Sequence, residues 1–247
     1  MKITYAQYSH IGSRDRNEDS VAALSDGTTG LFLVADGLGG HGLGDYASQL
    51  TVRTAAEMYQ ADPAGFTLPN AFQLAQERLL REQQERGIKG EMKTTFVALD
   101  IRMGKANTGV AAWAHIGDSR LYCFKKRKLM TRTLDHSVPQ MLVAMGDIRE
   151  KDIRGHVDRN RLLRVMGSPW ESRSFTLADP QKISKPLQFL LCTDGFWENI
   201  VEKDMQDSLK NAATVEEWLQ KMVEIVHRNG QGPHMDNNSA VAVWVEK

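Results

Sequence analysis

The sequence predicts an α+β protein, a four-layer α-β-β-α sandwich in which two central, mainly antiparallel sheets are flanked by helix pairs. Three observations predict it. Many strand-like apolar runs follow one another without a helix between them, which is typical of antiparallel sheets. Two groups of segments show helical periodicity, and amphipathic helices need a sheet to bury their apolar faces. The 247 residues are enough for one large core, so we expect a single catalytic domain over residues 1–247.

The expected strands are short apolar runs bounded by turn residues. They lie at residues 3–9, 20–24, 31–35, 94–101, 108–116, 120–124, 174–177, 187–193 and 240–245. The first helix pair is expected at about 44–60 and 69–86, the second helix being closed by Gly87. The second pair lies near the C-terminus, where Thr214 and Glu217 form a capping-box pattern.

Between about residues 134 and 170 the chain turns polar and irregular, with short helical pieces near 138–145 and 150–154. Long irregular segments in a compact protein commonly border a functional site. We therefore expect a flap at about 134–170 that lies beside the site.

The composition excludes several classes of function. Lysine plus arginine equals aspartate plus glutamate at 31 each, so no net field attracts nucleic acid or an anionic membrane. Apolar runs are shorter than the ~18 residues of a membrane span, and the first residues lack a signal peptide's apolar segment. A cytoplasmic protein is expected. Cys123 and Cys192 lie in apolar strand patterns, which favours buried thiols over reactive ones.

Aspartates stand at the ends of four strand-like runs. Asp36-Gly37 and Asp194-Gly195 each close a run, Gly117-Asp118 follows a third, and Asp236 precedes the last. If these strands share a core, the carboxylates collect on one rim, where they could not all stay ionised without cations between them. The pattern therefore indicates hard, oxygen-preferring metals. Either Asp-Gly pair alone would be better explained as turn chemistry.

An oxidoreductase is an alternative, because residues 37–42 also fit the dinucleotide fingerprint G-x-G-x-x-G after a strand and before a helix. Two residues argue against it. Asp36 stands where a pyrophosphate would approach, and Glu57, the acidic residue about 20 positions on, falls inside a predicted helix rather than at the end of a second strand.

Six motifs occur in order between residues 14 and 239. They are Arg14-Asp15-Arg16-Asn17-Glu18-Asp19-Ser20, Val34-Ala35-Asp36-Gly37-Leu38-Gly39-Gly40-His41, Gly117-Asp118-Ser119-Arg120, Asp135-His136-Ser137, Thr193-Asp194-Gly195-Phe196-Trp197 and Asp236-Asn237-Asn238-Ser239. Together they resemble the bacterial form of the protein phosphatase 2C type family of metal-dependent serine/threonine phosphatases. The resemblance covers almost the whole chain and implies a hydrolase of phosphoserine and phosphothreonine in signalling.

The resemblance also implies cofactors, partners and a mechanism. Two Mn²⁺ or Mg²⁺ ions, with a weaker third, would supply a metal-bridging hydroxide that attacks the phosphate directly. Phosphorylated proteins would be the substrates, and a serine/threonine kinase acting on the same proteins would be the partner. An inactive phosphatase-like binding module is a further alternative, although such a module would lack a core metal ligand and none is missing here.

Family roles can be carried over to individual metal-site residues. Asp36 resembles the carboxylate that bridges both metals, with the Gly37 carbonyl on one ion and Asp194 and Asp236 on the other. Asp118 would help Asp194 hold the third cation, with a hairpin turn as the alternative. Glu18 and Asp19 resemble residues that hold metal-bound water, with a solvated turn before a strand as the alternative. Glu198 stands where many family members have Asp.

Two further residues are expected to act on the substrate. Arg14 matches the family's phosphate-binding arginine, whose planar guanidinium can hold two phosphate oxygens. The alternatives are Arg16 in that role, or a surface salt bridge. His41 is the candidate catalytic acid or, equally, a structural hydrogen-bonding residue. The eukaryotic pattern has its histidine directly after the Asp-Gly, where this chain has Leu38.

Overall fold

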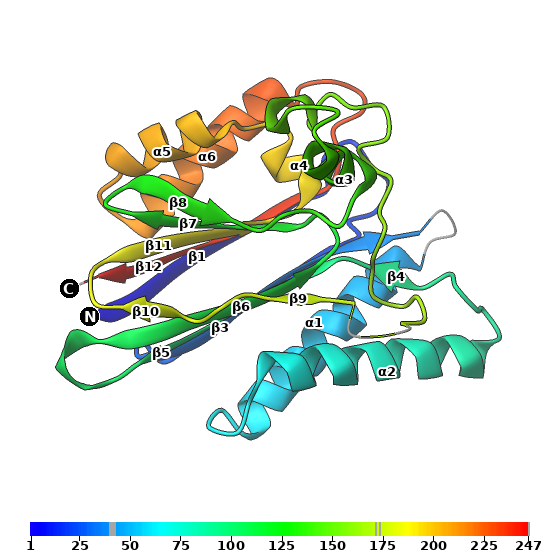
Figure 1. The fold of residues 1–247 in the computed structure, drawn as a ribbon, viewed down its shortest axis with the longest axis horizontal. Coiled ribbons are helices and arrows are strands. Elements are labelled where there is room, and N and C mark those ends of the chain that lie inside the picture. The colour runs from blue at the N-terminus through cyan, green and yellow to red at the C-terminus, as the bar shows by residue number, and fades with distance from the viewer. Residues whose placement is uncertain (40–42, 171, 173, 247) are drawn as a thin grey trace.

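The computed structural model describes residues 1–39, 43–170, 172 and 174–246. Two antiparallel sheets lie face to face between two layers of helices (Figure 1). This arrangement confirms the predicted α-β-β-α sandwich. Within the described ranges, no helix combines the length and the apolar character that crossing a membrane requires.

The strands pair in two sheets. In spatial order, the first sheet contains β1 (Lys2–His10), β12 (Asn238–Glu246), β11 (Leu187–Cys192), β7 (Arg120–Lys125) and β8 (Lys128–Arg132). The second contains β10 (Gln181–Ile183), β6 (Gly109–Ile116), β5 (Phe96–Met103), β3 (Thr29–Leu38) and β2 (Asp19–Ser25), with β4 (Lys93–Thr94) paired to β3 and β9 (Thr176–Leu177) paired to β6.

Strands β8 and β10 were not predicted from the sequence. Each lies at the edge of its sheet; β8 is largely solvent-exposed, and β10 is three residues long with only Ile183 buried. An edge strand needs little apolar surface and commonly carries charged side chains, so its sequence lacks the pattern of a buried strand.

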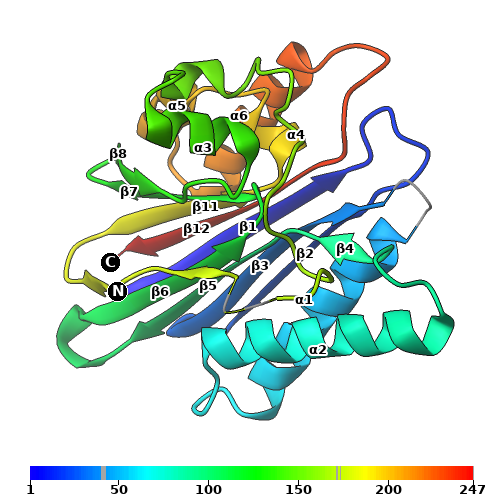
Figure 2. The same cartoon turned by 45° about the vertical axis from the view of Figure 1, so that its right-hand side comes forward.

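Helix pairs cover the outer faces of both sheets. Helices α1 (Gly44–Ala61) and α2 (Leu68–Arg86) lie against the second sheet, and α5 (Glu202–Lys210) and α6 (Val215–Asn229) lie against the first (Figures 1 and 2). Short helices α3 (Val138–Met145) and α4 (Asp194–Trp197) and 3-10 helices at Lys105–Asn107 and Glu150–Asp152 complete the helical segments of the described chain.

Local signals explain where the long helices begin and end. The Thr214 hydroxyl accepts a hydrogen bond from the Glu217 amide at 3.2 Å, as the capping pattern predicts. Helix α2 ends at Gly87, which adopts a left-handed conformation with φ of 67°. These caps fix the lengths of the helices.

Three apolar layers hold the sandwich together. Along β3, Leu31 and Leu33 pack toward α1 and α2, whereas Phe32 and Val34 pack between the sheets. A third layer lies between the first sheet and α5 and α6 and includes Trp218. Because β3 is buried on both faces, it reads as a continuous apolar run. Packing on both faces of β3 therefore fixes the position of Asp36, which lies near the C-terminal end of the strand.

Candidate active site

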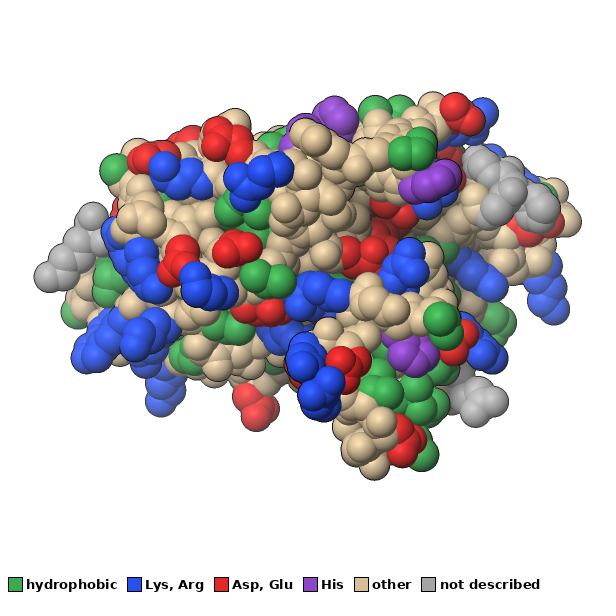
Figure 3. Space-filling view, turned by 90° about the horizontal axis from the view of Figure 1, so that it is seen from above, with side chains coloured by type: hydrophobic (Ala, Val, Ile, Leu, Met, Phe, Trp, Pro, Cys, Tyr) green, Lys and Arg blue, Asp and Glu red, His purple; other side chains and the backbone are tan. Residues whose placement is uncertain are grey.

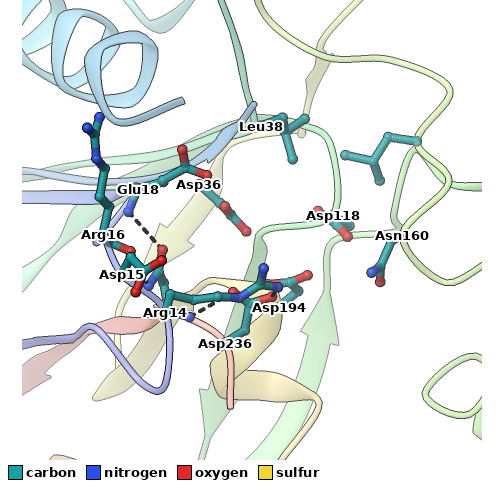
Figure 4. Close-up of a pocket in the computed structure, with 12 residues that line it drawn as sticks. Arg14, Asp15, Arg16, Glu18, Asp36, Leu38, Asp118, Asn160, Asp194 and Asp236 are labelled. Atoms are coloured by element: carbon teal, nitrogen blue, oxygen red, sulfur yellow. Dashed lines mark hydrogen bonds and ion pairs between the residues drawn. The ribbon is translucent and has the colours of Figure 1, made fainter. Parts of the chain in front are cut away.

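The four strand-end aspartates meet in one cavity of about 450 Å³. Its lining includes Arg14 and Glu18 together with Asp36, Asp118, Asp194 and Asp236 (Figure 4). Figure 3 shows acidic side chains in a recess of the surface to the right of centre. The structure thus brings together residues that are as many as 222 positions apart in sequence, as for Arg14 and Asp236.

Asp36 lies inside β3, two residues before the strand ends, and not just beyond the strand as predicted. Asp19 is the first residue of β2 and pairs directly with Asp36 of β3. Asp19 does not line the cavity; it is buried beside it, where Thr193 Oγ1 donates a hydrogen bond to its Oδ2 at 3.0 Å. Its Oδ1 has no hydrogen-bond partner in the described structure.

Gly37 allows the close approach of β3 to the start of α1. A Cβ atom at this position would come within 2.1 Å of the Gly44 carbonyl oxygen. The Gly37 amide donates to the Glu18 carbonyl at 3.0 Å, which ties the loop before β2 to β3. Only glycine fits here, so the Asp-Gly sequence reflects packing as well as turn chemistry.

Asp118 does not lie in a hairpin, and that alternative is wrong. Strands β6 and β7 belong to different sheets, so residues 117–119 carry the chain from one sheet to the other. Gly117 has a φ of +95°, and a Cβ there would approach the Thr95 side chain to 2.6 Å. The crossover places the buried Asp118 carboxylate at the gap between the sheets.

Thr95 connects the two sheets beside the aspartates. Its Oγ1 accepts a hydrogen bond from the Asp36 amide at 2.9 Å and shares another with Ser119 Oγ at 2.7 Å. The Thr95 amide in turn donates to the Asp36 carbonyl at 2.8 Å. Sequence reasoning missed Thr95, because a threonine at the start of a strand carries no distinctive signal.

Asn237 organises the loop that carries Arg14. Its Oδ1 accepts from the Glu18 amide at 2.8 Å, and its Nδ2 donates to the carbonyls of Ile11 and Arg16 at 2.7 and 2.9 Å. A single side chain therefore fastens the loop between β1 and β2 to the start of β12. Asn237 belongs to the motif at 236–239, but its sequence did not reveal this role.

Arg14 and Arg16 differ in direction. Arg14 Nη2 lies 2.7 Å from Asp236 Oδ2, whereas the Arg16 guanidinium points away from the carboxylates (Figure 4). The Arg14–Asp236 pair is exposed enough that its contribution to stability is small. The remaining N–H groups of Arg14 are available to an anion in the cavity.

Mutual repulsion and burial dominate the electrostatics of the site. Burial, followed by the charge of Asp194, raises the pKa of Asp36 and of Asp118 well above the usual range. Burial and then Asp236 raise the pKa of Asp194. Burial is also the main cause that raises the pKa of Asp19 to about 7. Cations between these carboxylates would offset both the repulsion between them and the cost of burying their charges.

The donor set fits hard divalent cations. Every side-chain atom of the aspartate cluster that could ligate a metal is a carboxylate oxygen. Asp19 Oδ1, buried beside the cavity, accepts no hydrogen bond from the described residues. Within residues 1–39, 43–170, 172 and 174–246, no group of three or more His, Cys, Asp or Glu side chains is close enough together to hold a metal ion without further ligands.

Glu198 and His41 are the two remaining positions that the sequence singled out. Glu198, at the end of α4, forms an ion pair with Arg159 of the flap region at 3.2 Å. Burial and then Asp194 raise the pKa of Glu198 to about 7. His41 lies outside the described residues, so its role stays a prediction.

Comparisons with known proteins agree on one family. The family model described as Protein phosphatase 2C matches residues 6–240. The serine/threonine phosphatase stp of Listeria monocytogenes is 31% identical over 213 residues, covering 83% of this chain and 81% of that protein. The serine/threonine protein phosphatase PstP of Mycobacterium tuberculosis is 28% identical over 248 residues, covering 98% of this chain and 45% of that protein.

Solved structures show the same similarity. The crystal structure of the Mycobacterium tuberculosis phosphatase PstP/Ppp superposes with a TM-score of 0.84 at 28% identity and covers 100% of both chains. A PstP catalytic domain in complex with two manganese ions gives a TM-score of 0.82 at 27% identity, covering 100% of this chain and 99% of that one.

Proposed function

Since this chain belongs to the protein phosphatase 2C family of metal-dependent serine/threonine phosphatases, we propose that it hydrolyses phosphoserine and phosphothreonine in proteins at the carboxylate cavity. One observation carries the proposal. The buried Asp118, the partly exposed Asp36 and Asp194, and the Arg14 guanidinium converge on the same cavity, which combines cation ligands with an anion-binding group.

Two Mn²⁺ or Mg²⁺ ions would be held by Asp36, the Gly37 carbonyl, Asp194 and Asp236. A relative of known structure binds two manganese ions, which supports this number. Bound divalent cations supply a water nucleophile at neutral pH and neutralise the phosphate's charge. Asp118 together with Asp194 would hold a third, weaker ion.

The protein's own groups position the reactants. Arg14 binds the phosphate oxygens through N–H groups that Asp236 does not occupy. Glu18, which lines the cavity, and Asp19, which is buried beside it with Oδ1 unpartnered among the described residues, would accept hydrogen bonds from water held by the ions and so orient it. No Ser, Cys or His occurs among the described residues that line the cavity. We infer direct attack by water held beside the ions, without a phosphorylated enzyme intermediate.

A protein substrate has room beside the cavity. A second cavity of about 480 Å³ shares Arg14, Asn160, Asp194 and Asp236 with the first. The flap at about 134–170 contributes Asn160 to both, so it would contact residues flanking the phosphorylated side chain. We place residues 1–247 in a single catalytic domain, with a serine/threonine kinase of opposing action as its partner.

Hydrolysis of a phosphothreonine peptide and of p-nitrophenyl phosphate tests the proposal. Turnover should require Mn²⁺ or Mg²⁺, stop with EDTA and continue with okadaic acid. Metal binding without turnover of either ester would instead indicate an inactive binding module. Binding of a nicotinamide nucleotide without phosphatase activity would indicate the oxidoreductase alternative.

A further inference from the structure

Trp197 contacts the backbone of Asp118 from an element far away in sequence. Its Nε1 donates a hydrogen bond to the Asp118 carbonyl oxygen at 3.0 Å, and its ring is buried in the core under α5 and α6. We propose that Trp197 is a positioning residue that fixes the Asp118 carboxylate for cation binding. The inference rests on the proposed function, and it assigns a task to a side chain that does not touch the ions.

The Trp197 ring is held by a buried ion pair. The Arg120 guanidinium carbon lies 3.4 Å from the centre of the ring. Arg120 Nε and Nη2 bind the two oxygens of Asp135 at 2.8 and 2.6 Å, and both side chains are at most 2% exposed. A bidentate pair of this kind has one geometry, so it presents a fixed cationic plane to the indole.

The backbone of Trp197 is held separately. Arg154 Nε donates to the Trp197 carbonyl at 3.1 Å, and Arg154 Nη2 also binds Glu202 Oε1 at 2.8 Å. The position of the indole N–H is therefore set by Arg120 and Arg154, neither of which lines the cavity. Trp197 can restrain Asp118 without depending on it.

The peptide groups on both sides of Asp118 are restrained. The Gly117 amide donates to His136 Nδ1 at 3.2 Å, and the His136 amide donates to the Gly117 carbonyl at 2.9 Å. Trp197 holds the next carbonyl, that of Asp118 itself. The Asp118 side chain thus projects from a backbone fixed at two successive peptides.

Such restraint has a physical reason. Asp118 is buried and repelled by the charges of Asp194 and Asp135, which would turn a free carboxylate away from the cavity. A fixed backbone keeps the carboxylate in place until a cation relieves the repulsion. Preorganised ligands of this kind bind more tightly, because they lose less freedom on binding.

Trp197→Phe removes the indole N–H and keeps an aromatic ring. Loss of one buried hydrogen bond predicts roughly a 3- to 10-fold weaker Mn²⁺ affinity at the Asp118 end of the cavity, measured by calorimetry. The matched control is Trp218→Phe. Trp218 is also buried and donates its Nε1 hydrogen to a backbone carbonyl, that of Met205, at 3.1 Å, but it lies in α6 away from the cavity lining.

A double-mutant cycle decides whether the effect passes through Asp118. Trp197→Phe should weaken Mn²⁺ binding in the native background. In the Asp118→Asn background, the same substitution should leave the Mn²⁺ affinity unchanged. An equal change in both backgrounds, or a change no larger than that of Trp218→Phe, overturns the inference. If Trp197→Phe does not fold, Arg154→Met replaces it in the cycle with the same expectation, because a methionine side chain has no N–H group to donate to the Trp197 carbonyl.

The same experiment separates this inference from the proposed function. Calorimetry reads Mn²⁺ binding whether or not the protein turns over a phosphate ester. A wild-type protein without metal-dependent turnover contradicts the proposed function, whereas an active wild type with an additive cycle contradicts the role of Trp197.

Discussion

Asp19 and Asp36 face each other as direct partners across β2 and β3. Like charges at opposed positions of a sheet repel, and both carboxylates are largely removed from water, Asp19 fully and Asp36 in part. Burial is the largest cause of the raised pKa at each. The arrangement is unfavourable without cations and becomes favourable with them, so it links the stability of this end of the sandwich to metal binding.

Asp36→Asn should lower kcat by at least ~10²-fold, because the bridging carboxylate serves both cations. The metal-free variant should melt no lower than the metal-free wild type, since the substitution removes a buried charge. The stabilisation that Mn²⁺ gives the wild type should be lost. Exposed Asp179→Asn is the control and should match the wild type in both assays. A wild-type rate in Asp36→Asn would contradict the two-metal site.

Arg14→Ala should reduce kcat/KM by about 10- to 150-fold through loss of a charge-assisted bidentate contact with phosphate. Mn²⁺ affinity should not fall, because the substitution releases Asp236 from its 2.7 Å ion pair. Arg16→Ala, whose guanidinium points away from the carboxylates, is the control (Figure 4). Loss of metal binding in Arg14→Ala would give Arg14 a structural role instead.

Asp118→Ala should raise the Mn²⁺ concentration needed for half-maximal rate and lower turnover. The position is a crossover between the sheets, and the variant should fold nearly normally because it removes a buried, repelled charge. A melting-temperature measurement and a Mn²⁺ titration on the same variant check this. Destabilisation by ~1–2 kcal/mol with an unchanged metal requirement would discard the third site.

The flap at about 134–170 should exchange its amide hydrogens faster than the sheets do. It exposes apolar side chains such as Leu134, Met145 and Val157 and contains only short helices. Shortening it should affect phosphoprotein substrates more than p-nitrophenyl phosphate. Hydrogen exchange as slow there as in β3 would contradict the prediction.

Protonation of His136 should destabilise the protein in acid. Burial, and next the neighbouring His115, lower the pKa of His136 to about 3, and its Nδ1 accepts the Gly117 amide hydrogen. The unfolded chain, with a pKa near 6.5, takes up this proton first, so stability is full above about pH 6.5 and declines as the pH falls toward 3. His136→Asn keeps an acceptor without titrating.

The measurement is the free energy of unfolding between pH 7 and 5. The wild type should lose about 2 kcal/mol more than His136→Asn over this range. Exposed His234→Asn serves as the control and should behave as the wild type does. Identical pH profiles for all three proteins would show that His136 is free to protonate in the folded state.

Much of the fold follows from local signals in the sequence. The apolar runs of β3 and β11 and the caps at Thr214 and Gly87 depend on residues within a few positions of one another, so they predict both elements and ends. The strand-end aspartates also gather as predicted, because strands that share two packed sheets end at a common rim.

Tertiary structure alone decided the remaining features of the site. The Asp19–Asp36 register, the crossing at Asp118 and the bonds of Thr95 and Trp197 join segments from different strands, sheets or helices. No periodicity or spacing within one segment specifies which distant group it will meet. The sequence by itself therefore determined the elements and the type of chemistry, while long-range packing determined which side chains hold that chemistry in place.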